Sequence, residues 1–152
     1  MEFSQITPDL FIGGMPTAAD YEQLHDLGVR LILNMRFARR LPEGVIQPPF
    51  EVLWLRTLDN PLFPIPLGKL RQGAQAALET ISKGGKVYTH CAYGRHRGVA
   101  MGAAVLIAQG QTAEAAMQLI KEKRAIADPD VFYIRQRILA FARRWKPELR
   151  DY

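Results

Sequence analysis

The sequence is poor in the features that mark secreted, membrane-bound or disulfide-rich proteins. It has one cysteine in 152 residues, Cys91, which excludes an internal disulfide and any zinc site built from several cysteines. No apolar run is long enough to cross a bilayer, so no membrane span is expected. The first ten residues are polar and include Pro8, which is not typical of a secretory signal. From these absences we expect a cytoplasmic protein.

Blocks of like charge, internal repeats and low-complexity segments are missing as well. Lys and Arg number 20 against 15 Asp and Glu, giving a formal net charge of +5. This excess favours an anionic partner without distinguishing a phosphate ester, a nucleic acid or a membrane surface. Two basic groups stand out: Arg36, Arg39 and Arg40, and Lys121, Lys123 and Arg124. Both are interpreted as solvated surface, with a substrate rim as the alternative for the first.

The length suits one compact domain over residues 1–152. Apolar runs with turn residues between them predict strands at 10–13, 29–34, 50–55 and 86–89. Helical spacing predicts helices at 17 to about 27, 66–82, 98–109, 112–124 and from 130 onward, with Thr17, Thr112 and Asp130 as capping residues. The alternation predicts an α/β fold, in which helices flank a central, mostly parallel sheet.

Polar residues follow three of the predicted strands. Cys91 lies just beyond one strand, Asn34 ends another, and Asp59 lies in the loop after a third. In open α/β sheets, ligands bind beyond the carboxyl ends of the strands. If the strands are parallel, these three residues meet at one rim.

The clearest chemical signal is the segment His90-Cys91-Ala92-Tyr93-Gly94-Arg95-His96-Arg97, which a helix follows at once. Such a loop can wrap a phosphate with successive backbone N–H groups, and a glycine at its centre permits the tight turn. The positive end of the helix dipole points at the same place, and Arg97 can hold two phosphate oxygens. The predicted phosphate-binding residues are Ala92, Tyr93, Gly94, Arg95, His96 and Gly98. Phosphate or sulfate is expected to bind there.

The same positive field lowers the pKa of a thiol, so Cys91 is predicted to be a thiolate nucleophile that forms a thiophosphoryl intermediate. His90 is expected to orient Cys91 through hydrogen bonds. A leaving alkoxide needs a proton, and Asp59 is the only acid between Glu51 and Glu79. The alternative for Asp59 is a turn former. No metal or other cofactor is expected, because the loop and Arg97 already neutralise a phosphate.

This segment matches the HCxxGxxR signature, and in it the chain resembles the protein tyrosine phosphatase superfamily. The opening from Ile6 to Gly14, the Leu27-Gly28-Val29 before the next strand, and the spacing from Asp59 to Cys91 are similar to the small dual-specificity branch. The resemblance implies that Cys91 is the nucleophile, Arg97 the phosphate clamp, Asp59 the general acid and base, and Asn34 a buttress of the loop. The alternative for Asn34 is a polar strand end.

The chain departs from the family pattern at two places. The family usually has Ser or Thr after the arginine, where this chain has Gly98. In the family, that hydroxyl helps the cysteine thiolate to leave in the second step. Its absence here predicts slow breakdown of the intermediate. The pair Arg95-His96 inside the loop is similar to that of phosphatases acting on inositol pyrophosphates.

The expected substrate is a phosphorylated protein, with phosphotyrosine and phosphoserine or phosphothreonine both accepted in a shallow pocket. The alternative is a polyphosphorylated small molecule: an inositol phosphate or pyrophosphate, a phosphoinositide or an RNA 5′ end. No obligate nucleic-acid partner is expected. A slow-turnover phosphate-binding module is a second class of hypothesis, and a rhodanese-type sulfurtransferase is the third.

Overall fold

The computed structural model describes residues 2–37 and 50–145, and within them five strands form one sheet in the order β1-β2-β5-β3-β4. The strands are β1 (Phe3–Thr7), β2 (Leu10–Gly13), β3 (Val29–Asn34), β4 (Glu51–Trp54) and β5 (Lys86–His90). All neighbours pair in parallel except β1, which is antiparallel to β2. The mostly parallel sheet is therefore confirmed. Sequence patterning missed β1 because this edge strand is mostly half-exposed and has little apolar periodicity.

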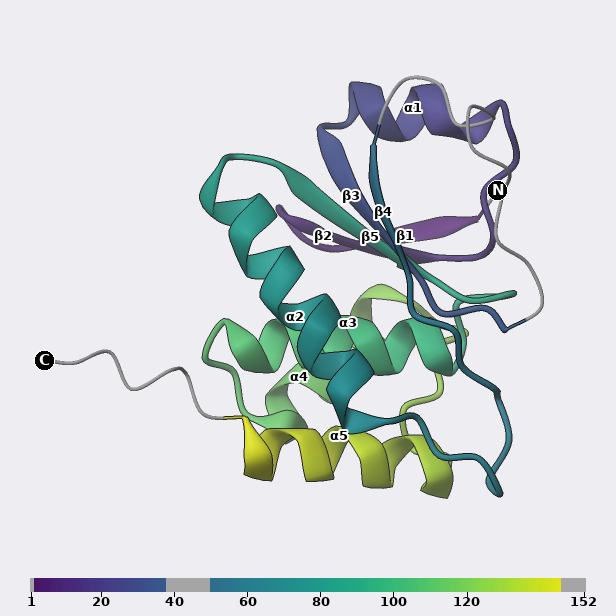
Figure 1. Ribbon diagram of the computed structural model, residues 1–152, viewed down its shortest axis with the longest axis vertical. Coiled ribbons are helices and arrows are strands. Elements are labelled where there is room, and N and C mark those ends of the chain that lie inside the picture. The colour runs from purple at the N-terminus through teal and green to yellow at the C-terminus, as the bar shows by residue number, and fades with distance from the viewer. Residues whose placement is uncertain (1, 38–49, 146–152) are drawn as a thin grey trace, which may run out of the picture.

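Helices cover both faces of the sheet (Figure 1). One face carries α1 (Asp20–Asp26), and the other carries α2 (Leu67–Ser82), α3 (Arg97–Ala108), α4 (Ala113–Lys123) and α5 (Phe132–Arg144). Alternate residues of the strands supply two separate cores, as the period of a strand requires. Phe11, Ile32 and Tyr88 pack beneath α1, while the larger core includes Ile12, Leu31 and Val87. The predicted α/β architecture is confirmed.

Helix α3 lies at the centre of the larger core, where it contacts α2, α4, α5 and the sheet. Every residue from Gly98 to Ile107 is buried, as the apolar character of the segment on all faces predicts. Burying one Val, Leu or Ile side chain stabilises a fold by about 1.5–3 kcal/mol. The position of α3 is therefore firmly fixed, and so is the position of its first residue, Arg97, at the end of β5.

Two of the three predicted helix caps differ from the structure. Thr112 caps α4 by accepting a hydrogen bond from the Ala115 N–H at 3.1 Å, as predicted. Helix α1, however, begins at Asp20, whose carboxylate accepts bonds from the backbone and hydroxyl of Thr17, both at 2.7 Å. Asp130 does not cap α5, because its carboxylate pairs with Lys121 at 2.7 Å and Arg135 at 3.4 Å.

Three parallel strands end level with one another. Asn34 at the end of β3 lies opposite His90 of β5 on one side and Trp54 of β4 on the other. The loops that follow these strands therefore leave from one edge of the sheet, as predicted. No described helix is long and apolar enough to span a membrane.

Candidate active site

The loop at residues 91–97, called the phosphate loop below, joins β5 to α3 and turns sharply at Gly94. Gly94 has a φ of +65°, in the left-handed region that favours glycine. A Cβ at this position would lie 2.5 Å from the carbonyl carbon and oxygen of Gly13, at the end of β2. The expectation that Gly94 permits the tight turn is confirmed, and the close approach of β2 gives a second reason for glycine.

Arg124 stabilises the phosphate loop by donating hydrogen bonds to its backbone carbonyls. Sequence patterning missed this role. Its Nε donates to the Gly94 carbonyl at 2.8 Å, and its Nη2 donates to the Tyr93 carbonyl at 2.9 Å. Its Nη1 donates to the Ser4 hydroxyl of β1 at 3.1 Å. The side chain is 1% exposed, so its interpretation as solvated surface was wrong. Lys121 and Lys123, the other members of that basic group, are exposed.

A signal for the buried position of Arg124 was present in the sequence. Arg124 follows Ile120 by four residues and therefore continues the apolar face of α4. The buried residues of that face are Ala113, Ala116, Met117 and Ile120. A lone arginine at the end of an apolar helical stripe points inward and needs buried acceptors, which the loop carbonyls provide.

Cys91 is buried at the base of the loop, beside His90. The neutral His90 ring donates through Nδ1 to the Cys91 backbone carbonyl at 3.2 Å. Burial lowers the pKa of His90 to about 4, and the positive charges of Arg36 and Arg97 act in the same direction. A ring that stays neutral near pH 7 suits the predicted role of holding the backbone at Cys91.

Arg97 is positioned by two carbonyl groups at the rim. Its Nη1 donates to the Thr57 carbonyl at 2.8 Å and to the Met35 carbonyl at 3.2 Å. Its Nε is buried and has no hydrogen-bond partner among the described residues. One edge of the guanidinium is thus anchored to the protein, while Nε is left to donate to a phosphate oxygen.

The structure brings Asp59 from the loop after β4 to the phosphate loop, where two side chains hold its carboxylate. Tyr133 of α5 donates its hydroxyl to Oδ1 at 2.6 Å, and Oδ2 lies 2.9 Å from His96 Nδ1. Partial burial acts to raise the pKa of Asp59, but the bonds from Tyr133 and His96 and the charges of His96 and Arg97 outweigh it. The pKa of Asp59 therefore lies below its usual value. The bond to Asp59 raises the pKa of Tyr133 to about 12.

Tyr133 was not among the predicted site residues. It lies two residues beyond Val131 at the start of α5, and nothing in the local pattern separates it from the apolar residues of that helix. Only the tertiary packing of α5 against the loop after β4 brings it to Asp59.

Asn34 is buried, and its Oδ1 accepts a hydrogen bond from the Arg36 N–H at 2.9 Å. The Asn34 side chain therefore stabilises the turn after β3. This hydrogen bond does not contact the phosphate loop, so it does not support the predicted role of Asn34 as a buttress of that loop. The Arg36 carbonyl in turn accepts from Trp54 Nε1 at 2.7 Å. Arg36 is half-buried, while Arg39 and Arg40 lie outside the described residues.

Gly98 is buried in the first turn of α3, with little space for a side chain. A Cβ there would lie 3.1–3.2 Å from backbone atoms of His90 and Cys91. The Thr89 hydroxyl donates to the Gly98 carbonyl at 2.7 Å, so it is committed to this bond. Of the other predicted phosphate-binding residues, Tyr93 is 77% exposed and Arg95 is exposed, whereas Ala92 and His96 are half-buried.

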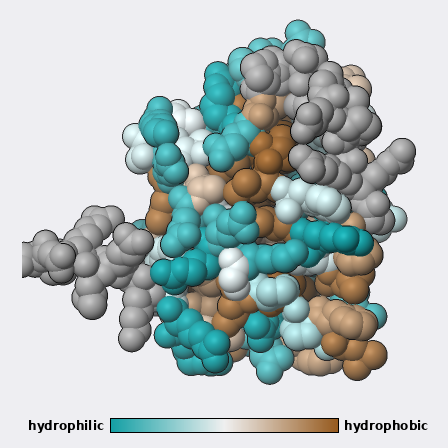
Figure 2. Space-filling view, in the orientation of Figure 1, coloured by the Kyte–Doolittle hydropathy of each residue, from teal (hydrophilic) through white to brown (hydrophobic). Residues whose placement is uncertain are grey.

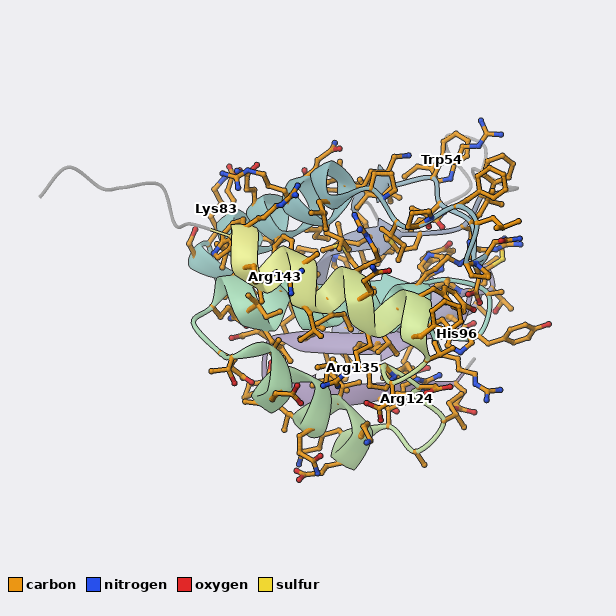
Figure 3. The ribbon with its side chains drawn as sticks, turned by 90° about the horizontal axis from the view of Figure 1, so that it is seen from below. Trp54, Lys83, His96, Arg124, Arg135 and Arg143 are labelled. Carbon is orange, nitrogen blue, oxygen red and sulfur yellow. The ribbon has the colours of Figure 1, made fainter. Side chains whose placement is uncertain are left out.

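Figure 3 shows Trp54, His96 and Arg124 at one end of the molecule, with His96 beside the start of α5, and Lys83 and Arg143 at the opposite end. Among residues 2–37 and 50–145, no group of three or more His, Cys, Asp or Glu side chains is arranged to hold a metal ion.

The site combines the thiol of Cys91, the guanidinium of Arg97 and the carboxylate of Asp59. These are the groups that nucleophilic displacement at phosphorus requires.

Comparison with known proteins agrees with this geometry. Dual specificity phosphatase 28 from Mus musculus is 29% identical over 130 residues, covering 85% of this chain and 77% of the relative. The phosphatidylglycerophosphatase and protein-tyrosine phosphatase 1 of Homo sapiens is 34% identical over 112 residues, 69% of this chain and 55% of that protein. The crystal structure of human DUSP28 superposes with a TM-score of 0.82 at 25% identity, covering 93% of both chains. No family model matches the sequence.

The fold and the relatives support a phosphatase of the protein tyrosine phosphatase superfamily. Within that superfamily, the curated relatives and the solved structures of similar fold support the small dual-specificity branch.

Proposed function

We propose that the protein hydrolyses phosphate monoesters through a thiophosphoryl-cysteine intermediate, and that its substrates are proteins carrying phosphotyrosine, phosphoserine or phosphothreonine. One observation carries the proposal: the phosphate loop after β5 and the loop after β4 bring Cys91, Arg97 and Asp59 together beyond the carboxyl ends of the strands. A site that merely bound phosphate would need neither a nucleophile nor a proton donor.

The geometry supports a two-step displacement. In the first step the Cys91 thiolate attacks phosphorus, an S–P bond forms, the P–O bond to the leaving group breaks, and a proton passes through the Asp59 carboxyl to the leaving oxygen. In the second step water attacks phosphorus, gives a proton to Asp59, and the S–P bond breaks. Arg97 and the backbone N–H groups of the loop hold the phosphoryl oxygens throughout.

An open rim favours a macromolecular substrate. Leu62 and Phe63, in the loop that carries Asp59, are 81% and 58% exposed, and Phe132 at the start of α5 is 69% exposed. The face in Figure 2 is apolar at its lower right, where that loop passes the start of α5 in Figure 1. Arg137 of α5 donates to the Ile65 carbonyl at 3.0 Å, which ties the two segments together. Exposed apolar residues beside a phosphate site suit contact with the residues flanking a phosphorylated side chain.

A second candidate is a polyphosphorylated small molecule or a phospholipid monoester. The exposed Arg95 in the loop and Arg36 at the rim favour it, because additional phosphates need additional cations. One relative is named for both a lipid phosphate and protein tyrosine phosphate, so both substrate kinds occur among similar proteins.

A substrate panel tests the proposal. Phosphopeptides, inositol phosphates, phosphoinositides and 5′-triphosphate RNA are compared by kcat/KM, with Cys91→Ser as the control. We expect phosphopeptides to be hydrolysed and the variant to be inactive. Preference for a polyphosphate, together with a steep loss of its binding as salt rises, would support the second candidate. Equal rates of p-nitrophenyl phosphate hydrolysis by the wild type and Cys91→Ser would leave only a binding module.

A further inference from the structure

His96 lies between two carboxylates that come from different parts of the chain. Its Nδ1 is 2.9 Å from Asp59 Oδ2, and its Nε2 is 3.6 Å from Asp128 Oδ2. Asp128 is held in place because its backbone N–H donates to the Arg95 carbonyl at 3.0 Å. The His96 side chain is only 17% exposed, so water has limited access to the ring and the two carboxylates are its nearest charged neighbours.

Carboxylates facing both ring nitrogens favour one state of the imidazole. A neutral ring has one N–H donor and one bare nitrogen, and the bare nitrogen would face a negative charge. The imidazolium donates from Nδ1 to Asp59 Oδ2, and it brings its positive charge to within 3.6 Å of Asp128 Oδ2, which is an ion-pair distance without a hydrogen bond. Two other groups face the cluster: the Tyr133 hydroxyl donates to Asp59 Oδ1, and the positive charge of Arg97 acts on Asp59. The positive charge of Arg97 disfavours a second cation at His96, but the two negative charges of Asp59 and Asp128 outnumber it.

This arrangement answers a difficulty of the proton-transfer step. Asp59 has to deliver a proton, yet the surroundings that hold it favour its ionised form. A carboxyl loses its proton well below neutral pH, whereas an imidazole does so near neutrality. A pair of the two shares one proton whose loss belongs to the pair and not to either residue.

We propose that His96 is a positioning residue that stores the proton which Asp59 delivers, so that the general acid of this enzyme is the His96–Asp59 pair. In the resting pair the proton lies on His96 Nδ1 and Asp59 is a carboxylate. As the P–O bond breaks, the leaving oxygen takes a proton through the carboxyl, and His96 is left neutral. In the second step the proton released by the attacking water returns to the pair.

The proposal rests on the proposed phosphatase reaction, and pH profiles with two similar substrates separate the two. Phenyl phosphate releases a poorer leaving group than p-nitrophenyl phosphate and depends more on a proton donor. In the His96→Asn variant the amide can still donate to Asp59 Oδ2 but cannot store a proton. We expect the basic limb of kcat/KM for phenyl phosphate to move to lower pH, because the Asp59 carboxyl then has no imidazole with which to share its proton. The rate with phenyl phosphate should fall more than that with p-nitrophenyl phosphate.

Asp128→Asn provides a second, milder variant, because it removes only the carboxylate facing Nε2. We expect a shift of the basic limb in the same direction but smaller. If His96→Asn and Asp128→Asn change KM or overall rate while the basic limb stays where it is in the wild type, His96 does not store the proton. That result leaves the phosphatase proposal intact, provided that Cys91→Ser abolishes hydrolysis of both substrates. Activity that survives Cys91→Ser would instead overturn the phosphatase proposal.

Discussion

Replacing Arg124 should loosen the phosphate loop although the residue is far along the chain from it. Two of its hydrogen bonds end on loop carbonyls and a third on Ser4. A hydrogen bond to a charged group contributes about 1.5–3 kcal/mol. In Arg124→Ala both loop bonds are lost, which amounts to about 3–6 kcal/mol, a large part of the roughly 5–15 kcal/mol that holds a domain folded.

Arg124→Lys is the more informative change, because it keeps the positive charge but removes the guanidinium whose Nε and Nη2 donate to two loop carbonyls. One ammonium group cannot reach both the Gly94 and Tyr93 carbonyls in the geometry that the guanidinium uses. Losing one bond lowers the free energy of unfolding by about 2 kcal/mol, or about 4–8 °C in Tm for a domain of this size. The mispositioned loop should also lose at least about tenfold in kcat/KM, which corresponds to about 1.4 kcal/mol.

Thermal unfolding with and without phosphate, together with p-nitrophenyl phosphate kinetics, checks this prediction. Arg135→Lys is a matched control: Arg135 is 36% exposed and pairs with Glu114 and Asp130 on the surface, so its replacement should change Tm little. If Arg124→Lys unfolds at the wild-type temperature and keeps its kcat/KM, Arg124 does not hold the loop.

Three further predictions concern the site. Gly98→Ser should raise turnover and shorten the burst phase, although the approach of its Cβ to His90 costs about 1–3 kcal/mol of stability; Gly98→Ala has the same cost without the hydroxyl, so equal burst kinetics of the two variants would contradict this. Tyr133→Phe removes a donor that lowers the pKa of Asp59, so the basic limb for phenyl phosphate should move to higher pH, opposite to His96→Asn. Because burial lowers the pKa of His90 from 6.5 to about 4, the fold prefers the neutral ring, and the free energy of unfolding should fall as pH drops from 6.5 towards 4; His90→Asn should flatten this dependence in pH-dependent denaturation.

The sequence was sufficient to predict the sheet edge and its loops, because those features depend on local patterns. The apolar runs before Asn34 and Cys91 predict parallel strands, and parallel strands end at one edge. Gly94 and Arg97 follow from the chemistry of wrapping a phosphate in backbone N–H groups. The same reasoning placed Asp59 at the rim.

The sequence was not sufficient where contacts join distant segments. Arg124 lies 30 residues from Gly94, and Tyr133 lies 74 residues from Asp59. Their hydrogen bonds depend on how α4 and α5 pack, which no local periodicity reports. The predicted cap Asp130 failed for a related reason: it has charged partners in Lys121 and Arg135, so its carboxylate does not cap the first turn of α5.

The bond between Arg124 and Ser4 also joins the phosphate loop to β1, an edge strand of the sheet. Edge strands exchange their amide hydrogens most readily, since each has one neighbour. Whenever β1 separates from β2, Arg124 loses a partner that helps to aim its guanidinium at Tyr93 and Gly94. We therefore expect opening of β1 to weaken the support that Arg124 gives to the phosphate loop. Hydrogen exchange of β1 amides should slow when an oxyanion occupies the loop.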